Sequence, residues 1–394
     1  MWKSILGCLA CICGLFPFIV SSAPVVAHAS EGLIHRSQTR VLVAAPLKSS
    51  EVPNPNYTIL ESVSPISKND IWTAGFQSGG TDVNPWNQPL LKHWDGSGWH
   101  NVTFPTTEFT PNFYSIQALN AKSVYVAGYA NNASYIAHWD GTNWQTVYTG
   151  PRNSGILLAI AAIDANDIWA VGDELVHWDG KVWQRFNDAT ALILRSIAVI
   201  NKDDIWAVGN NLQIGGPAIL HWNGKIWSSI VPPALGTDVV LNSITAPDKK
   251  NIWISGQNRG QIAILHWNGH DWQYLSRPSP GVLYNRLLGI TAKSEHDIWA
   301  VGSTQMNTCT FYCAQQTLIE HWNGLRWQVV KSPDVLLPGN VVQDNVLYGV
   351  AALHADDVWA VGTSYAGYKG LSYAGNTLIE HWDGQSWQII PSAG

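Results

Sequence analysis

Residues 167–172 read Asp-Ile-Trp-Ala-Val-Gly, and residues 177–183 read His-Trp-Asp-Gly-Lys-Val-Trp. These two phrases decide the fold, because both recur and alternate with each other between residues 57 and 390. Self-similarity at a fixed period is the signature of repeat architectures and has to be recognised before any single element is assigned. Each phrase occurs seven times, which predicts seven structural units.

Both phrases centre on aromatic residues. The aromatic positions of the first phrase are Trp72, Tyr125, Trp169, Trp206, Trp253, Trp299 and Trp359. The second phrase starts at His93, His138, His177, His221, His266, His321 and His381. Together the phrases hold all but two of the 22 tryptophans, the exceptions being Trp2 and Trp86.

Every copy contains four short apolar segments, which in the third copy are residues 157–162, 168–171, 175–178 and 182–186. They are strand length, rich in β-branched and aromatic residues, and bounded by Gly, Asp and Asn. No segment shows a helical period over two turns. The Asp-Gly or Asn-Gly between the third and fourth segments is a hairpin signal, because it accepts positive φ. Four antiparallel strands repeated every ~45 residues predict an all-β, seven-bladed β-propeller over residues 57–394.

The first 29 residues are interpreted as a signal peptide. The apolar run from Ile5 to Val20 is shorter than the ~20 residues of a membrane span. Lys3 supplies the positive charge before it, and residues 27–29 give a small-x-small cleavage pattern. We therefore expect a secreted or extracellular protein associated with the cell surface, with an uncleaved anchor as the alternative.

Residues 30–56 are expected to form a loose N-terminal arm. Within the arm, Arg40–Ala44 could add one strand to the last blade as a latch, since the repeats alone leave the closure of the ring open. Cys309 and Cys313 are predicted to form a small disulfide loop in an exported protein. Two thiols alone make a poor zinc site, which takes four ligands when it is structural.

The charge excludes one class of partner. The formal net charge is −6, and no basic run is present, whereas nucleic-acid binders need a basic footprint. Asp-rich turns such as residues 164–167 could bind calcium, but Asp and Asn are also standard turn formers, and we favour that interpretation. We expect no cofactor, no metal and a monomer.

The repeated tryptophans and histidines are interpreted as structural. A catalytic residue is needed once, whereas a packing residue is needed in every blade. The residue two positions before each repeated histidine is apolar, and positions two apart in a strand share a face. We expect each histidine to bond the Asp or Asn between the first two strands of its blade, such as Asp167 or Asp297, because buried polar groups are normally paired.

Function is expected on the loops of variable length. The connections between the second and third strands are longest in blades 1, 6 and 7, at residues 76–89, 303–316 and 363–376. These blades are neighbours in a closed ring, so the three loops form one lobe. The predicted ligand-binding residues of this lobe are Trp86, Phe311, Tyr312, Tyr365, Tyr368 and Tyr373. Aromatic faces beside amides suit sugars or a protein partner. Local packing of the loops over the blades is the alternative.

The phrases Asp-Ile-Trp-Ala-Val-Gly and Ile-x-His-Trp-Asp-Gly-x-x-Trp resemble the repeats of secreted bacterial tryptophan-rich β-propellers. More loosely, they are similar to tectonin-type lectin repeats, a resemblance that implies carbohydrate or cell-surface binding. The Asp-Gly-x-x-Trp turn also resembles the Asp-box of sialidases, but the upstream Ser/Thr and an arginine trio are missing. The resemblance covers residues 57–390 through short strand phrases only, so it transfers the fold better than the function.

We therefore expect a non-enzymatic binding module whose partner is a glycan or a surface protein. A protein–protein scaffold, a glycan-active hydrolase or lyase, and a structural spacer are the alternatives. Glycosidases usually need two carboxylates across a cleft. The carboxylates of the variable loops form no recognisable pair; they are Asp82, Glu108, Asp238, Asp334 and Asp344.

Overall fold

The computed structural model describes most of the repeat region. The described residues are 57–81, 84–105, 110–186, 192–213, 215–231, 235–276, 280, 284–305, 314–337, 341–365 and 375–392. The predicted signal peptide, the N-terminal arm with its possible latch strand, and the predicted disulfide lie outside these residues.

The strands form seven four-stranded antiparallel sheets, each made of strands consecutive in the chain. In blades 1 to 4 the strands are β1 (Tyr57–Ser67), β2 (Asp70–Thr81), β3 (Asn84–Trp94) and β4 (Trp99–Asn101); β5 (Asn112–Asn120), β6 (Ser123–Ala130), β7 (Ala133–Trp139) and β8 (Trp144–Thr149); β9 (Leu157–Asp164), β10 (Asp167–Gly172), β11 (Leu175–Trp178) and β12 (Trp183–Phe186); β13 (Leu192–Asn201), β14 (Asp204–Asn211), β15 (Pro217–Trp222) and β16 (Trp227–Ile230). In blades 5 to 7 they are β17 (Val239–Asp248), β18 (Asn251–Asn258), β19 (Gln261–Trp267) and β20 (Trp272–Ser276); β21 (Tyr284–Ser294), β22 (Asp297–Gln305), β23 (Gln315–Trp322) and β24 (Trp327–Val330); β27 (Asp344–His354), β28 (Asp357–Tyr365), β29 (Gly375–Trp382) and β30 (Trp387–Ile389). A small hairpin, β25 (Leu336–Leu337) and β26 (Val341–Val342), lies between blades 6 and 7.

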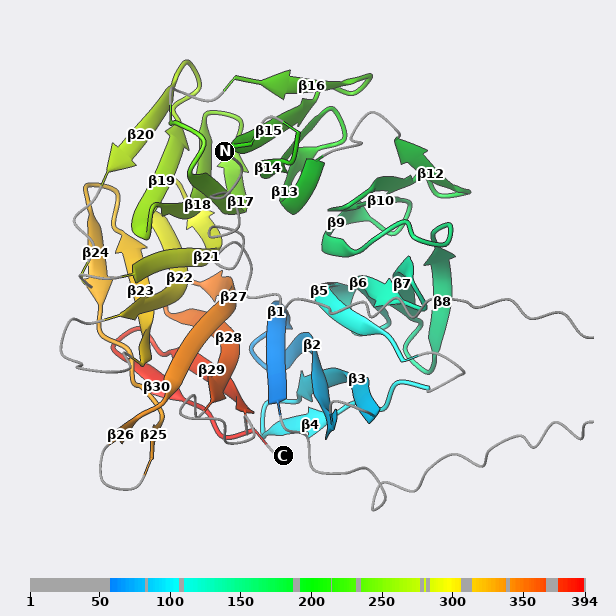
Figure 1. Ribbon diagram of the computed structural model, residues 1–394, viewed down its shortest axis with the longest axis horizontal. Coiled ribbons are helices and arrows are strands. Elements are labelled where there is room, and N and C mark those ends of the chain that lie inside the picture. Colours follow the sequence, from blue (N-terminus) through cyan, green and yellow to red (C-terminus); the bar gives the residue numbers. More distant parts are fainter. Residues whose placement is uncertain are drawn as a thin grey trace, which may run out of the picture. The chain divides into compact units, whose positions relative to one another are not determined.

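The blades stand around one axis as a β-propeller, which confirms the predicted fold class (Figure 1). The first strand of each blade lies innermost and the fourth lies outermost (Figure 1). Neighbouring innermost strands contact one another all the way round, including β1 and β27. Blades 6, 7 and 1 are therefore consecutive neighbours, as predicted.

The ring closes by packing of blade 1 against blade 7. Each of these blades is complete in itself, so no described strand crosses from one end of the chain to the other. Thr58 Oγ1 donates a hydrogen bond of 2.7 Å to the Gly375 carbonyl, and Thr363 Oγ1 donates one of 2.7 Å to the Thr58 carbonyl. Between the two sheets, Leu60, Ile71 and other residues of blade 1 pack on a blade 7 cluster that includes Trp359.

The predicted hairpin turns are present in all seven blades. The turn glycines have φ between 85° and 94°, which favours glycine over any residue with a Cβ; they are Gly96, Gly141, Gly180, Gly224, Gly269, Gly324 and Gly384. The Asp or Asn before each of them accepts hydrogen bonds from the backbone N–H groups two and three residues later, as Asp179 does at 2.9 Å. The acidic residues of these turns are thus used to build the turns.

The predicted bond between the histidine and an Asp or Asn is present in six of the seven blades, and in blade 2 the partner is a serine. In five blades the histidine Nε2 lies 2.7–2.9 Å from an Asp Oδ1 at the start of the second strand. Asn251 takes this place in blade 5 and Ser123 in blade 2. Each histidine ring also lies face to face with the repeated aromatic ring of its blade, with centroids 3.8–4.4 Å apart. The histidine, its hydrogen-bond partner and the stacked aromatic ring therefore connect the turn between the first two strands to the middle of every blade.

Replacing His321 by alanine is expected to lower the free energy of unfolding by about 1–3 kcal/mol, because Asp297 is left buried without its partner. Thermal and urea denaturation would measure the loss. His270→Ala is the control, since the His270 side chain is 91% exposed and should change stability little. A His321→Ala protein that melts like the wild type would refute the structural role of the network.

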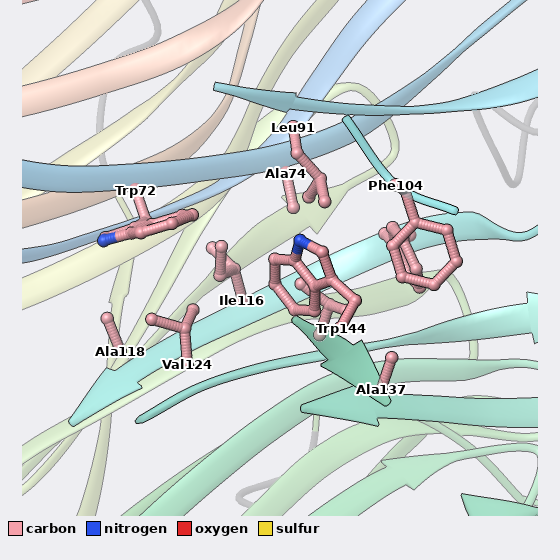
Figure 2. Packing of buried hydrophobic residues seen from close by; sticks show 11 residues of the cluster. Trp72, Ala74, Leu91, Phe104, Ile116, Ala118, Val124, Ala137 and Trp144 are labelled. Atoms are coloured by element: carbon pink, nitrogen blue, oxygen red, sulfur yellow. The ribbon is translucent and has the colours of Figure 1, made fainter. Parts of the chain in front are cut away.

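Tryptophans fill the space between neighbouring blades. Figure 2 shows the cluster between blades 1 and 2, where Trp72 and Leu91 of the first blade meet Ile116 and Trp144 of the second. The indole rings of Trp72 and Trp144 are edge to face, with centroids 6.3 Å apart. The same arrangement repeats around the ring, so blade-to-blade burial provides most of the apolar core.

The strand position just before each histidine varies in sequence, yet it is buried too. Lys92 is 2% exposed and donates a 2.7 Å hydrogen bond from Nζ to Asn101 Oδ1. Burial lowers the pKa of Lys92 to about 8. Glu320 and Glu380 occupy the same position in blades 6 and 7 and are fully buried. Burial raises the pKa of Glu380, and the neighbouring Asp334 raises it further. Both faces of the third strand therefore pack between blades.

Candidate functional site

Each innermost strand carries a β-bulge at the same position. The pairing between the first and second strands skips one residue, which stays unpaired where the two strands meet. A bulge re-aims a side chain and is often found beside functional sites. From blade 1 to blade 7, the extra residues are Glu61, Tyr114, Leu158, Arg195, Asn242, Leu288 and Tyr348.

The last glycine of the phrase Asp-Ile-Trp-Ala-Val-Gly makes room for the bulge. A Cβ at Gly75 would lie 1.9 Å from the carbonyl oxygen of Ile59 on the innermost strand. The equivalent glycine of every other blade would meet the same clash at 1.9–2.0 Å; they are Gly128, Gly172, Gly209, Gly256, Gly302 and Gly362. The repeated phrase thus encodes both the packing tryptophan and the bulge.

The seven bulge residues line a cavity of about 240 Å³ at the axis of the ring. Its wall contains one carboxyl group, one guanidinium group, two phenols, one amide and two leucines, with serine hydroxyls between them. The repeated aromatic, histidine and glycine positions are alike in nearly all blades, whereas this position carries five different residue types in seven blades. Unlike the repeated tryptophans, the residue type at the bulge is therefore not fixed by the repeat.

Glu61 dominates the electrostatics of one side of the cavity. Burial raises its pKa to about 8, although the positive charge of Arg286 opposes the shift. Arg286 is held in place by Nε–H donation to Ser303 Oγ at 3.0 Å and Nη2 donation to Gln315 Oε1 at 3.1 Å. At neutral pH Glu61 is therefore mainly a neutral acid that can donate a hydrogen bond.

Two tyrosines stand beside Glu61. Burial raises the pKa of Tyr348 to about 12 and also raises the pKa of Tyr114, so both stay phenols over the physiological range. Tyr348 is hydrogen-bonded to the hydroxyl of Tyr57. The phenols add aromatic faces and hydroxyl groups to this side of the wall.

The other side of the cavity is formed by Arg195 and Asn242. Arg195 Nε lies 3.4 Å from Asn210 Oδ1. Its charge also acts on Asp173: burial raises the pKa of that carboxyl, and the nearby Arg195 opposes the rise. Asn242 Nδ2 donates a 2.8 Å hydrogen bond to the Leu287 carbonyl of the next blade. Both side chains are therefore oriented by neighbours before any ligand arrives.

The predicted lobe lies on the connections of blades 1, 6 and 7, but more of it is strand than expected. Pairing continues to Thr81 and Asn84 in blade 1, to Gln305 and Gln315 in blade 6, and to Tyr365 and Gly375 in blade 7. The expectation of loops beginning at residues 76, 303 and 363 was wrong, because the backbone groups there pair across the hairpins. Phe311, Tyr312, Tyr368 and Tyr373 lie outside the described residues.

Two predicted lobe residues can be placed. Trp86 is half-buried and lies across the blade 1 hairpin on Gly79, where a Cβ would come within 2.5 Å of the indole ring. Its Nε1 is enclosed and has no hydrogen-bond partner among the described residues. Tyr365 meets Tyr57 edge to face with ring centroids 5.8 Å apart. Since Tyr57 bonds Tyr348, an aromatic chain connects the lobe to the cavity.

Of the loop carboxylates considered for catalysis, the three that the structure describes do not line the cavity. Asp238 pairs with the exposed Arg259 at 2.6 Å, Asp334 accepts from the Thr317 N–H at 2.9 Å, and Asp344 accepts from the Gln315 N–H at 2.8 Å. Asp82 and Glu108 lie outside the described residues. Glu61, which sequence reasoning missed, is the carboxyl that faces the cavity.

A second hollow between blades 7 and 1 is lined by Ile66, Lys68, His354 and Asp383, together with the His381–Asp357 pair of the repeated network. It lies beside turns that the whole ring repeats. The described residues contain no cluster of three or more His, Cys, Asp or Glu arranged to hold a metal ion. They also contain no helix long and apolar enough to cross a membrane.

No protein-family model matches the sequence, and no curated protein matches it significantly. Among solved structures, YCF48 bound to D1 peptide is similar with a TM-score of 0.54 at 15% identity, over 80% of this chain and 95% of that chain. The GH74 xyloglucanase from Xanthomonas campestris has a TM-score of 0.57 at 12% identity, over 86% of this chain and 55% of that chain. The WD40 β-propeller domain of Doa1 has a TM-score of 0.49 at 12% identity, over 78% of this chain and 93% of that chain. At these identities the similarity to YCF48 and to the xyloglucanase establishes the propeller fold alone.

Proposed function

We propose that this protein is a secreted, non-enzymatic binding module for carbohydrate, acting outside the cell or at its surface. The observation that carries the proposal is the ring of seven bulge residues around the axial cavity. The scaffold repeats its aromatic, histidine and glycine residues from blade to blade and varies the residues that face this cavity. Residues that contact a ligand have to match different parts of that ligand, so they differ between blades. Residues that pack equivalent blades together face the same surroundings in each copy, so they are repeated.

The chemistry of the wall suits a sugar ring. A sugar has an apolar C–H face and a rim of hydroxyl groups, so it needs apolar or aromatic surface together with hydrogen-bonding groups. Leu158, Leu288 and the phenol rings of Tyr114 and Tyr348 supply the surface. The phenol hydroxyls, the Asn242 amide and Glu61 supply the hydrogen bonds. The lobe of blades 6, 7 and 1 would hold further units of the glycan.

The wall supports binding better than hydrolysis. Glycosidases use two carboxyl groups about 5–9.5 Å apart. Among the described residues that line the cavity, Glu61 is the only carboxylic acid. One neutral acid without a second carboxylate can hold a sugar hydroxyl, but it lacks the partner that would activate water or form a covalent intermediate.

A glycan panel tests the proposal. The wild-type chain is expected to bind a subset of glycans, and Leu158→Trp is expected to bind them at least about tenfold more weakly, because the larger side chain fills the cavity. Tyr365→Ala tests the lobe in the same assay. Leu325→Ala is the control, since Leu325 is 87% exposed on a turn of blade 6 away from the cavity.

A protein ligand is the second candidate, because a structure of similar fold, YCF48, is bound to a peptide. Binding to no glycan together with selection of a defined peptide would replace carbohydrate with protein as the ligand class. Unchanged glycan binding by a folded Leu158→Trp protein would instead remove the cavity from the site. Melting curves of each variant separate loss of binding from loss of fold.

A further inference from the structure

We infer that the axial cavity takes an acidic sugar end group, such as a uronic acid, whose carboxylate pairs with the guanidinium of Arg195. This inference rests on the proposed glycan-binding function and names the class of sugar.

The size of the cavity limits the ligand to about one ring. Pockets for drug-sized ligands usually measure about 300–1,000 Å³. The axial cavity measures about 240 Å³ and is bounded by side chains from all seven blades. A single sugar unit fits this space, and a longer glycan would have to continue outside it. The cavity therefore recognises an end of a chain rather than its middle.

The placement of charge favours an anionic unit. Arg195 is the one cationic residue among the described residues that line the cavity. A guanidinium presents paired N–H donors that match the two oxygens of a carboxylate, which makes it the preferred partner for that group. Arg195 is already oriented by Asn210 and by the electric field of Asp173, so little ordering is needed on binding. Serine hydroxyls and the Asn242 amide complete a polar side that can accept the rest of the acid group.

Glu61 would oppose an anionic ligand if it were ionised. The groups facing it are Tyr57 on its own strand, Tyr114 on β5, Tyr348 on β27 and Arg286 on β21. The phenols carry no charge at neutral pH, and burial raises the pKa of Glu61 to about 8 against the effect of Arg286. Below that pH, Glu61 is neutral and can donate a hydrogen bond to a ligand oxygen. Above it, the cavity gains a negative charge and should reject an anion.

Calorimetric titration of the full chain with glucuronic acid and with glucose tests the inference. The acid is expected to bind at pH 6.5 at least about tenfold more tightly than glucose, by charge-assisted pairing with Arg195. Arg195→Gln should reduce its affinity to that of glucose. Arg326→Gln is the matched control, because Arg326 is exposed on a turn and should leave both affinities unchanged.

The pH profile provides a second readout that a purely structural role would not change. Wild-type affinity for glucuronic acid is expected to fall about tenfold between pH 7 and pH 9, since each pH unit above the pKa of Glu61 leaves about tenfold less of the neutral form. Glu61→Gln should keep its affinity at pH 9. Melting curves at both pH values check that the variants are folded.

Three results would overturn the inference. Equal affinity for glucuronic acid and glucose would leave the glycan-binding proposal standing and remove the acidic sugar. Binding of a peptide through its C-terminal carboxylate, with no binding of either sugar, would remove both proposals at once. Full affinity of a folded Arg195→Gln protein for glucuronic acid would assign the acid to another part of the surface and likewise overturn the inference.

Discussion

Trp299→Ala is expected to lower the free energy of unfolding by about 3–5 kcal/mol, the range for truncating a buried tryptophan. Trp299 is 1% exposed at the boundary between blades 6 and 7. Its ring lies 5.1 Å from Trp382 and 5.4 Å from Trp387, measured between centroids, and stacks on His321 at 4.0 Å. Alanine would remove these contacts and leave a hole that the two rigid sheets cannot close.

Urea denaturation followed by tryptophan fluorescence and circular dichroism would measure this loss as a lower midpoint. Leu325→Ala in the same blade is the control, because Leu325 is 87% exposed and its truncation should change stability by about 0.5 kcal/mol or less. A midpoint for Trp299→Ala equal to that of the control would show that the repeated tryptophans are not what holds neighbouring blades together.

The fold could be predicted because the same sequence pattern, which specifies one four-stranded blade, occurs seven times. The strand lengths, the Asp-Gly turns and the histidine that shares a face with an apolar residue all agree on one blade. The four-stranded blade and the turns were confirmed in all seven copies, and the histidine bond in six, as between His321 and Asp297 at 2.7 Å. The strands of blades 1, 6 and 7 were longer than predicted. Ring closure could not be predicted, because a complete blade at each end leaves no pattern that distinguishes a latch from simple packing.

The axial cavity was missed for a physical reason. A bulge shifts a strand by one residue, so strict alternation assigns the following side chains to the wrong face. The signal was nevertheless present: an apolar residue, a variable residue and a small residue stand together, as in Leu60-Glu61-Ser62 and Leu347-Tyr348-Gly349. Aligning the first strands of the seven copies would have isolated the variable position.

The lobe was predicted from loop length. The sequence predicts that its three blades are adjacent, but it does not predict which side chains of the lobe contact each other. Adjacency of blades 6, 7 and 1 follows from closure of any seven-bladed ring. That Tyr365 packs on Tyr57, and that Tyr57 reaches the cavity through Tyr348, depends on side-chain packing between the two ends of the repeat region. Periodicity carries no information about such pairs.

Gly75→Ala is expected to destabilise the protein by about 3 kcal/mol, at the upper end of the usual range for overpacking. The new Cβ would lie 1.9 Å from the Ile59 carbonyl oxygen and 2.9 Å from Leu60 Cα, which are backbone atoms and cannot rotate away. Strand β1 would have to move, and the bulge that directs Glu61 into the cavity would be lost with it. Melting temperature and the pH profile of ligand binding would both report the change.

Gly98→Ala is the matched control, because the same substitution in the same blade meets nothing closer than the His100 ring nitrogen at 3.9 Å. If Gly75→Ala lowers stability and also abolishes the pH dependence, then one glycine supports both the blade and the site. If it is as stable as Gly98→Ala, strand β1 has no bulge at Glu61, and the cavity loses its acidic side. The repeated glycine thus serves both the blade and the site: Gly75 pairs with Leu60, and the unpaired residue beside that pair, Glu61, is the one that lines the cavity.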